Sequence, residues 1–168
     1  DLLNLSVELN KIRAIFFTHG HFDHRGGLHT LLGYMRMIGR PDPLPIYLPE
    51  GCSEVIALAE AFQNCYCTSL PFEIELTELS ANEVVMIDDV TVKAFPMVHC
   101  GSIKNSDVLD QIPAMGYRIS YGNESVAISG DTGLCEPLRD LVRDTDLAVI
   151  EATYVTSQGR SRQLLENV

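Results

Sequence analysis

The sequence predicts a layered fold that mixes helices and strands, of the α+β or α/β class. Short apolar runs rich in β-branched residues alternate along the chain with segments whose apolar residues recur at helical spacing. The 168 residues are 46% hydrophobic, and the apolar residues are spread evenly. About one domain with a buried core is therefore expected, and disorder is excluded as a description of the whole chain.

The first half of the chain contains two predicted helices. Residues 12–18 form a short apolar run and predict a buried strand. A pair of glycines at 26–27 then opens a helix with apolar residues on one face, and Gly39 closes it. Ser53 is a suitable N-cap for a second helix over residues 53–62. The other strands expected here are 45–49, 72–76, 84–87 and 90–94, with a turn at 88–89.

The second half is expected to consist mostly of strands. Residues 100–113 are polar and aperiodic, and predict a loop. The tight-turn pair Gly122-Asn123 joins two further strands. The remaining expected elements are strands at 115–121, 125–129 and 147–152, a helix at 136–142, and the start of a helix after residue 154.

The charge balance is strongly acidic. There are 23 Asp and Glu residues against 12 Lys and Arg residues, for a net charge of −11. Residues 41–92 hold ten carboxylates and no Lys or Arg. Binding to nucleic acid through a broad basic surface is therefore not expected, since phosphate backbones require clustered cations.

Membrane insertion and a disulfide framework are not expected either. No apolar run approaches the ~20 residues that span a bilayer, and no targeting segment is visible. The five cysteines include no C-x-x-C pair, which favours reduced thiols in a cytoplasmic protein. Cys65 and Cys67 could bind metal, but we interpret them as small buried apolar residues.

The most informative segment lies directly after the first predicted strand. It contains His19, His21, Asp23 and His24, so three of the five histidines fall within six residues. In an extended segment, His19 and His21 project to the same side because side chains alternate. Neutral imidazoles with a carboxylate suit zinc and related ions. A solvated polar loop is the alternative, and His29, farther along, is interpreted as a helix-face residue.

Further ligands would come from the ends of later strands. His99 stands at the end of an expected strand over residues 92–98, and Asp131 at the end of the strand at 125–129. Functional groups often gather where strands run out into loops. Taken alone, each of these two residues also fits an ordinary surface position. They become candidate metal ligands because the first cluster lacks further ligands.

These residues together resemble the metallo-β-lactamase-fold hydrolases, and within them the ribonuclease Z-like branch. Four segments are similar to segments of that branch. They are HFDHRGGL at 21–28, GYRIS at 116–120, SGDT at 129–132 and LAVIEATY at 147–154. The similarity extends from about residue 12 to residue 154.

The resemblance implies a four-layer αβ/βα sandwich with a two-zinc site at one edge. One zinc ion would be held by His19, His21 and His99, and a metal-bridging hydroxide would be the nucleophile. Glu151 resembles an acid that supports the site in the ribonuclease Z branch. The second zinc ion would be held by Asp23, His24 and a shared Asp131, with Asp23 also acting as a catalytic residue that orients the hydroxide or carries its proton.

Three departures from the family pattern stand out. No His follows His99, so one usual ligand of the second zinc ion is missing. The chain begins at Asp1, almost at the first motif. Ile150 precedes Glu151 where a His is usual. We therefore expect residues 1–168 to be a single domain that lacks the first strands and the C-terminal part of the fold, unless another chain completes it.

Phosphodiester hydrolysis is the expected activity, with RNA as one candidate substrate and small esters left open. Arg25, Arg36 and Arg40 are the only basic group near the motif, and Arg36 and Arg40 are expected to share a helix face. No membrane partner is expected, and a homodimer is compatible with the sequence.

Two other classes of protein also fit parts of the sequence. A non-catalytic or degenerate metal-binding domain would fit the incomplete second site. Asp131-Thr132-Gly133 also matches the Asp-Thr-Gly string of aspartic proteases. That chemistry needs two carboxylates, hence a homodimer, and it would leave the histidine cluster unexplained.

Overall fold

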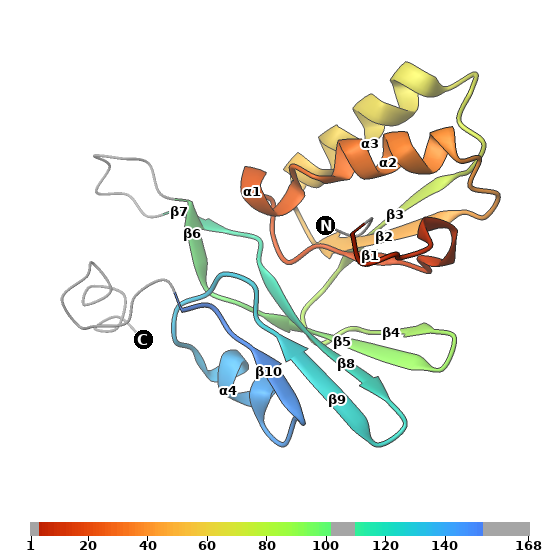
Figure 1. Ribbon diagram of the computed structural model, residues 1–168. Coiled ribbons are helices and arrows are strands. Elements are labelled where there is room, and N and C mark those ends of the chain that lie inside the picture. The colour runs from red at the N-terminus through yellow and green to blue at the C-terminus, as the bar shows by residue number, and fades with distance from the viewer. Residues whose placement is uncertain (1–3, 102–109, 153–168) are drawn as a thin grey trace. The chain divides into compact units, whose positions relative to one another are not determined.

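The structure, a computed structural model, describes residues 4–101 and 110–152 (Figure 1). The chain divides into two compact units, Asp1–Glu78 and Leu79–Val168, which we describe one at a time. The helix expected after residue 154 and the middle of the loop expected at 100–113 lie outside the described residues. The prediction of a single domain over residues 1–168 stays a prediction.

The first unit is a three-stranded sheet with helices (Figure 1). Its strands follow the order β1-β2-β3, and β1 pairs in parallel with β2. Parallel neighbours need a long crossover, and the segment that holds the histidine motif and two helices supplies it. The elements are a 3₁₀ turn at Leu9–Lys11, β1 (Ile15–Phe16), α1 (Phe22–Arg25), α2 (Leu28–Met37), β2 (Leu44–Pro49), α3 (Ser53–Tyr66) and β3 (Ile74–Leu79).

Two amphipathic helices build the core of this unit. In α2, Leu32 and Met35 are fully buried, as the helical spacing of apolar residues predicts. In α3, Val55, Ala59 and Phe62 are buried on one face. They pack in one cluster with the inner residues of β2, which are Leu44, Ile46 and Leu48. Each large side chain buried in this way contributes about 1.5–3 kcal/mol.

Gly39 closes the first helix as predicted, whereas the second helix differs from the prediction at both ends. The second helix runs to Tyr66, and its N-cap is Cys52 rather than Ser53. The first helix ends at Met37, before Gly39 with a φ of 67°. The chain turns there, so Arg40 does not share a helix face with Arg36, and that prediction is wrong.

Arg40 is instead buried, with 2% of its surface exposed. Its guanidinium donates hydrogen bonds to the backbone oxygens of Leu9 (3.1 Å), Ile12 (2.9 Å) and Pro43 (2.9 Å). Burial lowers the pKa of Arg40 from its ordinary value. The residue ties the segment before β1 to the segment before β2, and it belongs to no basic surface patch.

The second unit is a five-stranded sheet of order β10-β9-β8-β5-β4, with a separate hairpin of β6 and β7. Strands β4, β5, β8 and β9 pair antiparallel, whereas β10 is parallel to β9. The elements are β4 (Val84–Ile87), β5 (Val90–Pro96), β6 (His99–Gly101), β7 (Asp110–Ile112), β8 (Met115–Tyr121), β9 (Glu124–Ile128), α4 (Glu136–Val142) and β10 (Leu147–Val149).

The turns of this sheet follow the sequence signals. Asp88 has a φ of 51° and Gly122 a φ of 58°, left-handed values that Asp, Asn and Gly tolerate best. The loop expected at 100–113 is wrong at its ends, because His99–Gly101 and Asp110–Ile112 pair as strands.

The two faces of the five-stranded sheet differ in character. Helix α4 packs against β5 and β8 on one face, where Phe95, Ala127 and Leu141 form a buried cluster. Gly116 is required there, since a Cβ atom would lie 2.7 Å from a methyl carbon of Leu141. The opposite face carries a paired apolar row across all five strands, formed by Val85, Val92, Ile119, Val126 and Leu147.

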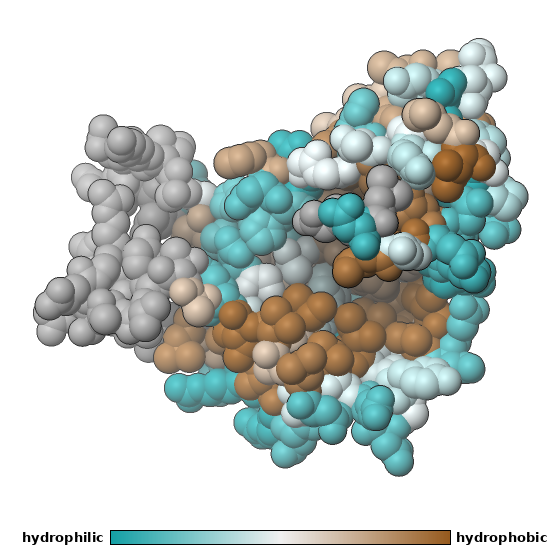
Figure 2. All heavy atoms as spheres, viewed as in Figure 1, coloured by the Kyte–Doolittle hydropathy of each residue, from teal (hydrophilic) through white to brown (hydrophobic). Residues whose placement is uncertain are grey.

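Figure 2 shows hydrophobic residues gathered over this sheet on the face in view. Leu147 and Val149 of β10 are 56% and 53% exposed.

Among the described residues, no helix has the length and apolar character needed to cross a membrane.

Candidate metal centre

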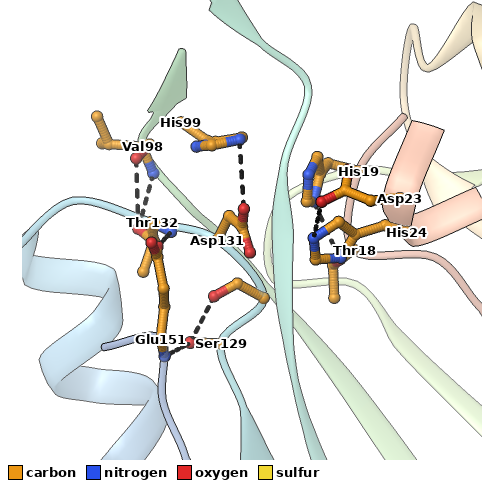
Figure 3. Close-up of polar contacts among 11 residues, drawn as sticks. Thr18, His19, Asp23, His24, Val98, His99, Ser129, Asp131, Thr132 and Glu151 are labelled. Carbon is orange, nitrogen blue, oxygen red and sulfur yellow. Dashed lines mark hydrogen bonds and ion pairs between the residues drawn. The ribbon is translucent and has the colours of Figure 1, made fainter. Parts of the chain in front are cut away.

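The histidine motif begins where β1 ends in the first unit. His19 is completely buried, and its Nδ1 shares a hydrogen bond of 3.1 Å with the Thr18 hydroxyl. The ring of His21 meets the ring of His19 edge-on, with centroids 4.8 Å apart. The ring of His24 lies 4.1 Å from that of His19. The rings of His21 and His24 therefore both pack against that of His19 within a single unit, as Figure 3 shows for His19 and His24.

Helix α1 brings the second part of the motif to the same place. His21 is its N-cap, and the His21 carbonyl accepts hydrogen bonds from the backbone N–H groups of His24 (3.1 Å) and Arg25 (3.2 Å). This single turn of helix folds the chain back, so that a carboxylate oxygen of Asp23 lies 3.7 Å from Nε2 of His24. Asp23 and His24 are therefore neighbours, as the sequence predicts.

Gly20, between the first two histidines, is closely packed. A Cβ atom at this position would lie 2.6 Å from a carboxylate oxygen of Glu54 and 3.1 Å from the sulfur of Cys52. Both residues stand at the start of α3. Burial raises the pKa of the Cys52 thiol, so the group next to Gly20 is a neutral thiol.

The second unit holds the other predicted ligands. His99 is the first residue of β6, and Asp131 follows β9. Nε2 of His99 lies 3.9 Å from a carboxylate oxygen of Asp131 (Figure 3). Two strand ends that are 32 residues apart in sequence thus deliver an imidazole and a carboxylate to one place.

A network of hydrogen bonds supports Asp131 from behind. Oε2 of Glu151 accepts a hydrogen bond of 2.8 Å from the backbone N–H of Thr132, and the backbone N–H of Glu151 donates to the hydroxyl of Ser129 (Figure 3). The Thr132 hydroxyl lies 3.3 Å from the backbone nitrogen of Val98, which donates to it. Segments 98–99, 129–132 and 151 are therefore bonded together around His99 and Asp131.

Sequence reasoning missed part of this support. It identified Glu151 but not the donor that Glu151 binds, the N–H of Thr132. It also took Arg25 for a member of a basic group, whereas Nε of Arg25 donates to the carbonyl of Gly20. The SGDT string was the available signal for Thr132. Nothing in the sequence marks the contact of Glu54 with Gly20.

Some polar residues stand apart from the centre. The ring of His29 packs edge-on against Phe62 at 5.2 Å, on α2 as predicted. All five cysteines are free thiols. Cys65 and Cys67 are exposed, so their interpretation as buried apolar residues is wrong; they lie at the end of α3, where the helix leaves the core.

An apolar cavity adjoins the motif within the first unit. Its volume is about 700 Å³. Thr18, His24 and Thr30 are the polar residues among those that line it. Most of the lining is apolar or aromatic, including Phe16, Leu28, Leu31 and Tyr34. The cavity therefore offers an apolar surface beside one of the predicted ligands.

The donor chemistry fits a metal site. Imidazole nitrogens and carboxylate oxygens are the ligands that zinc accepts, and the histidines of the first unit gather with His19 fully buried. The second unit adds an imidazole and a carboxylate held in place by backbone hydrogen bonds. Each unit thus presents ligands of the right type, positioned by strand ends and by α1.

A model of the Beta-lactamase superfamily domain matches residues 3–164 of the chain. The chain belongs to this superfamily. Ribonuclease Z of Bacillus subtilis (strain 168) is 30% identical over 194 aligned residues, which cover 92% of the chain and 62% of that relative. The prediction of a superfamily member similar to the ribonuclease Z branch is therefore confirmed.

Solved structures of the superfamily fold agree. The metallo-β-lactamase-fold protein YhfI of Bacillus subtilis matches with a TM-score of 0.68 at 18% identity, over 95% of this chain and 57% of its own. The short form of human tRNase Z matches with a TM-score of 0.68 at 22% identity, over 91% of this chain and 62% of its own. The predicted metallo-β-lactamase fold is confirmed, and the chain spans about three fifths of the length of these superfamily members.

Proposed function

We propose that the protein is a metal-dependent hydrolase of phosphodiesters, similar in activity to ribonuclease Z. The observation that carries the proposal is the gathering of His19, His21 and His24 in one unit, with centroid distances of 4.8 and 4.1 Å from His19. Three imidazoles directly after a strand in a member of this superfamily support metal binding far better than a solvated loop.

The predicted ligand assignment is retained as part of the proposal. His19, His21 and His99 would hold one zinc ion. The second ion would be held by Asp23, His24 and the shared Asp131. Within each unit the proposed ligands lie within a few ångströms of one another, as the contacts of His19 with His21 and of His99 with Asp131 illustrate. Membership of the superfamily accounts for Asp131 without the aspartic protease hypothesis.

Zinc ions bound there would supply Lewis acidity and lower the pKa of an attacking water molecule to ~7. The residues of the chain do the rest. Asp23, at the start of α1, would accept the proton of that water. Glu151 acts as a positioning residue, because its carboxylate fixes the N–H of Thr132 and so the backbone next to Asp131.

The proposed substrate is a phosphodiester that reaches the site through the charge of the metal ions. Two zinc ions would place +4 in one location, so a net charge of −11 does not oppose an anionic substrate there. RNA is the proposed macromolecular substrate, because the relatives are named ribonuclease Z and tRNase Z. A small ester is the alternative, and the apolar cavity beside His24 suits an aryl group of such a compound. We further propose that the protein works in the cytoplasm.

A non-catalytic metal-binding domain is the second candidate. One observation favours it: within residues 1–168, the ligands proposed for the second zinc ion include one imidazole, that of His24, beside two carboxylates. A site with one firmly held ion would bind metal without supplying the two-metal clamp that stabilises a phosphodiester transition state.

Metal content and turnover test the proposal together. We expect elemental analysis of the purified protein to find near-stoichiometric zinc or another divalent metal. We expect His19→Ala combined with His21→Ala to remove most of it, whereas His29→Ala leaves it unchanged. Folded protein that takes up no metal would contradict the proposal.

Hydrolysis of bis(p-nitrophenyl) phosphate, with and without added Zn²⁺, separates enzyme from binding domain. The proposed activity predicts metal-dependent release of p-nitrophenol that the double variant lacks. Full metal loading with no turnover, also in a longer form of the protein, would favour the non-catalytic domain.

A further inference from the structure

We propose that Arg25 is a positioning residue for the metal ligands, which holds the peptide between His19 and His21 in its binding geometry. This inference rests on the metal centre proposed above. It replaces the sequence-based interpretation of Arg25 as one of a group of surface cations near the motif.

Arg25 bonds to the motif twice. Its Nε donates a hydrogen bond of 2.8 Å to the carbonyl oxygen of Gly20. Its backbone N–H donates to the carbonyl oxygen of His21 at 3.2 Å. The two carbonyl groups that follow His19 are therefore both held by one residue, across a single turn of helix. Such bonds fix the path of the backbone from which both imidazoles project.

Gly20 also packs closely against the start of α3. A Cβ atom on Gly20 would contact the Glu54 carboxylate at 2.6 Å and the Cys52 sulfur at 3.1 Å. Cys52 is buried, with 1% of its surface exposed. Gly20 is thus bonded through its carbonyl to Arg25 and packs against the first turn of α3, and both contacts restrict movement of its peptide.

The charge of Arg25 argues against a merely electrostatic role. A guanidinium beside a cation site repels the metal ion, so removal of the charge alone should strengthen metal binding. Glu54 and Glu78 lie close enough to act on the pKa of Cys52, as Arg25 does with the opposite sign. The benefit of Arg25 to the site therefore lies in geometry, and its loss should weaken metal binding despite the lost repulsion.

A contact with the phosphate groups of a substrate is the competing role for Arg25. A phosphate contact would use the same guanidinium but would leave the ligand geometry unchanged when removed. The two roles therefore differ in what a metal probe reports without any substrate present.

Titration of the metal-free 168-residue protein with Co²⁺ separates them, because the absorption spectrum of bound Co²⁺ reports its ligand geometry. We expect Arg25→Met to weaken Co²⁺ binding 10–100-fold, the range found when groups that orient metal ligands are removed, and to change the spectrum. Arg25→Lys keeps the charge but lacks the planar Nε–H, and should also weaken binding. Arg36→Met is the matched control, since Arg36 also lies in the first unit, where it donates to Ser69 and stacks over Tyr66.

The outcomes are distinct. If Arg25→Met binds Co²⁺ as tightly as wild type or more tightly, with an unchanged spectrum, the positioning role is overturned. If that variant also shows a raised KM for bis(p-nitrophenyl) phosphate, Arg25 contacts the substrate instead. Failure of the wild-type protein to bind Co²⁺ at all overturns both this inference and the proposed function. Circular dichroism of the metal-free variants shows whether they fold, and Arg25→Lys decides the question if Arg25→Met does not.

Discussion

Gly20 packs against the start of α3. A Cβ atom there would meet the end of the Glu54 side chain at 2.6 Å and the sulfur of Cys52 at 3.1 Å, so these side chains would have to shift. We predict that Gly20→Ala lowers the free energy of unfolding by about 1–3 kcal/mol, the usual cost of overpacking, and lowers metal content with it. Thermal unfolding of the metal-free protein measures the first effect.

Gly33 provides the matched control within the same unit. It lies inside α2 with no atom near the position of a Cβ, so Gly33→Ala should stabilise the protein by up to about 1 kcal/mol through helix propensity. Adding Glu54→Ala to Gly20→Ala should recover part of the loss. Equal melting temperatures for Gly20→Ala and wild type would show that the peptide can move.

The cysteines should divide by accessibility and by pKa. Cys65 and Cys67 are exposed, whereas Cys52 is 1% exposed and burial raises the pKa of its thiol. A raised pKa reduces the thiolate fraction near neutral pH. In the folded protein we predict rapid reaction of Cys65 and Cys67 with a disulfide reagent such as Ellman's reagent, and reaction of Cys52 only on unfolding. Early labelling of Cys52, located by mass spectrometry, would contradict this.

At the scale of elements, α4 depends on a side chain from the sheet. Arg118 of β8 donates hydrogen bonds to the carbonyl oxygens of Leu141 (3.0 Å) and Arg143 (2.8 Å), at the C-terminal end of α4. A cation is favourable at this end of a helix, and bonds from charged donors contribute about 1.5–3 kcal/mol each. We predict that Arg118→Met lowers the free energy of unfolding by at least about 2 kcal/mol and speeds hydrogen exchange of the α4 amides.

Arg139→Met is the comparison for this prediction. Arg139 forms an exposed ion pair with Glu136 at 2.9 Å, and pairs of this kind contribute about 0–1 kcal/mol. Urea denaturation of both variants measures the difference. Similar losses in the two variants would show that Arg118 acts only as a surface charge.

Elements were predictable where pattern and turn chemistry agreed. Helix α4 and strand β8 have the predicted bounds, and the turn at Gly122 lies between the expected strands. The strand expected at 12–18 is reduced to Ile15–Phe16, because α1 and the histidine motif take the chain away from the sheet. Tertiary contacts also determine the environment of Arg40. Its guanidinium bonds to the backbone oxygens of Leu9 and Ile12, which lie 31 and 28 positions away and which no local pattern contains.

For the whole molecule, the charge balance sets a testable limit on RNA binding. The net charge is −11, and Arg25, Arg36 and Arg40 each make contacts within the protein. We predict that the metal-free protein binds a short single-stranded RNA more weakly than about 10⁻⁴ M, the weak end of non-specific binding at physiological salt. Fluorescence anisotropy at two salt concentrations measures this. Tight binding that falls steeply with salt would reveal a basic surface.

The part of the candidate site that could be predicted is the part whose chemistry follows from the types of its side chains. The crowding of His19, His21, Asp23 and His24 in the sequence pointed to metal binding before any geometry was considered. Groups that act through the backbone carry no such signature. Nearly every residue has a backbone N–H and a carbonyl group. Only the fold shows that the N–H of Thr132 binds Glu151 and that the carbonyl of Gly20 binds Arg25.

The parallel pairing of β10 with β9 restricts how this chain can gain or lose residues. Leu147 lies opposite Val126, and Val149 opposite Ile128, so both strands end at the same edge, before Ser129 and Glu151. A one-residue insertion within β10 would turn every later side chain of the strand to the other face and carry Glu151 away from Thr132. Length variation in this half of the protein should therefore occur in turns, and an alignment of relatives should show β10 free of gaps.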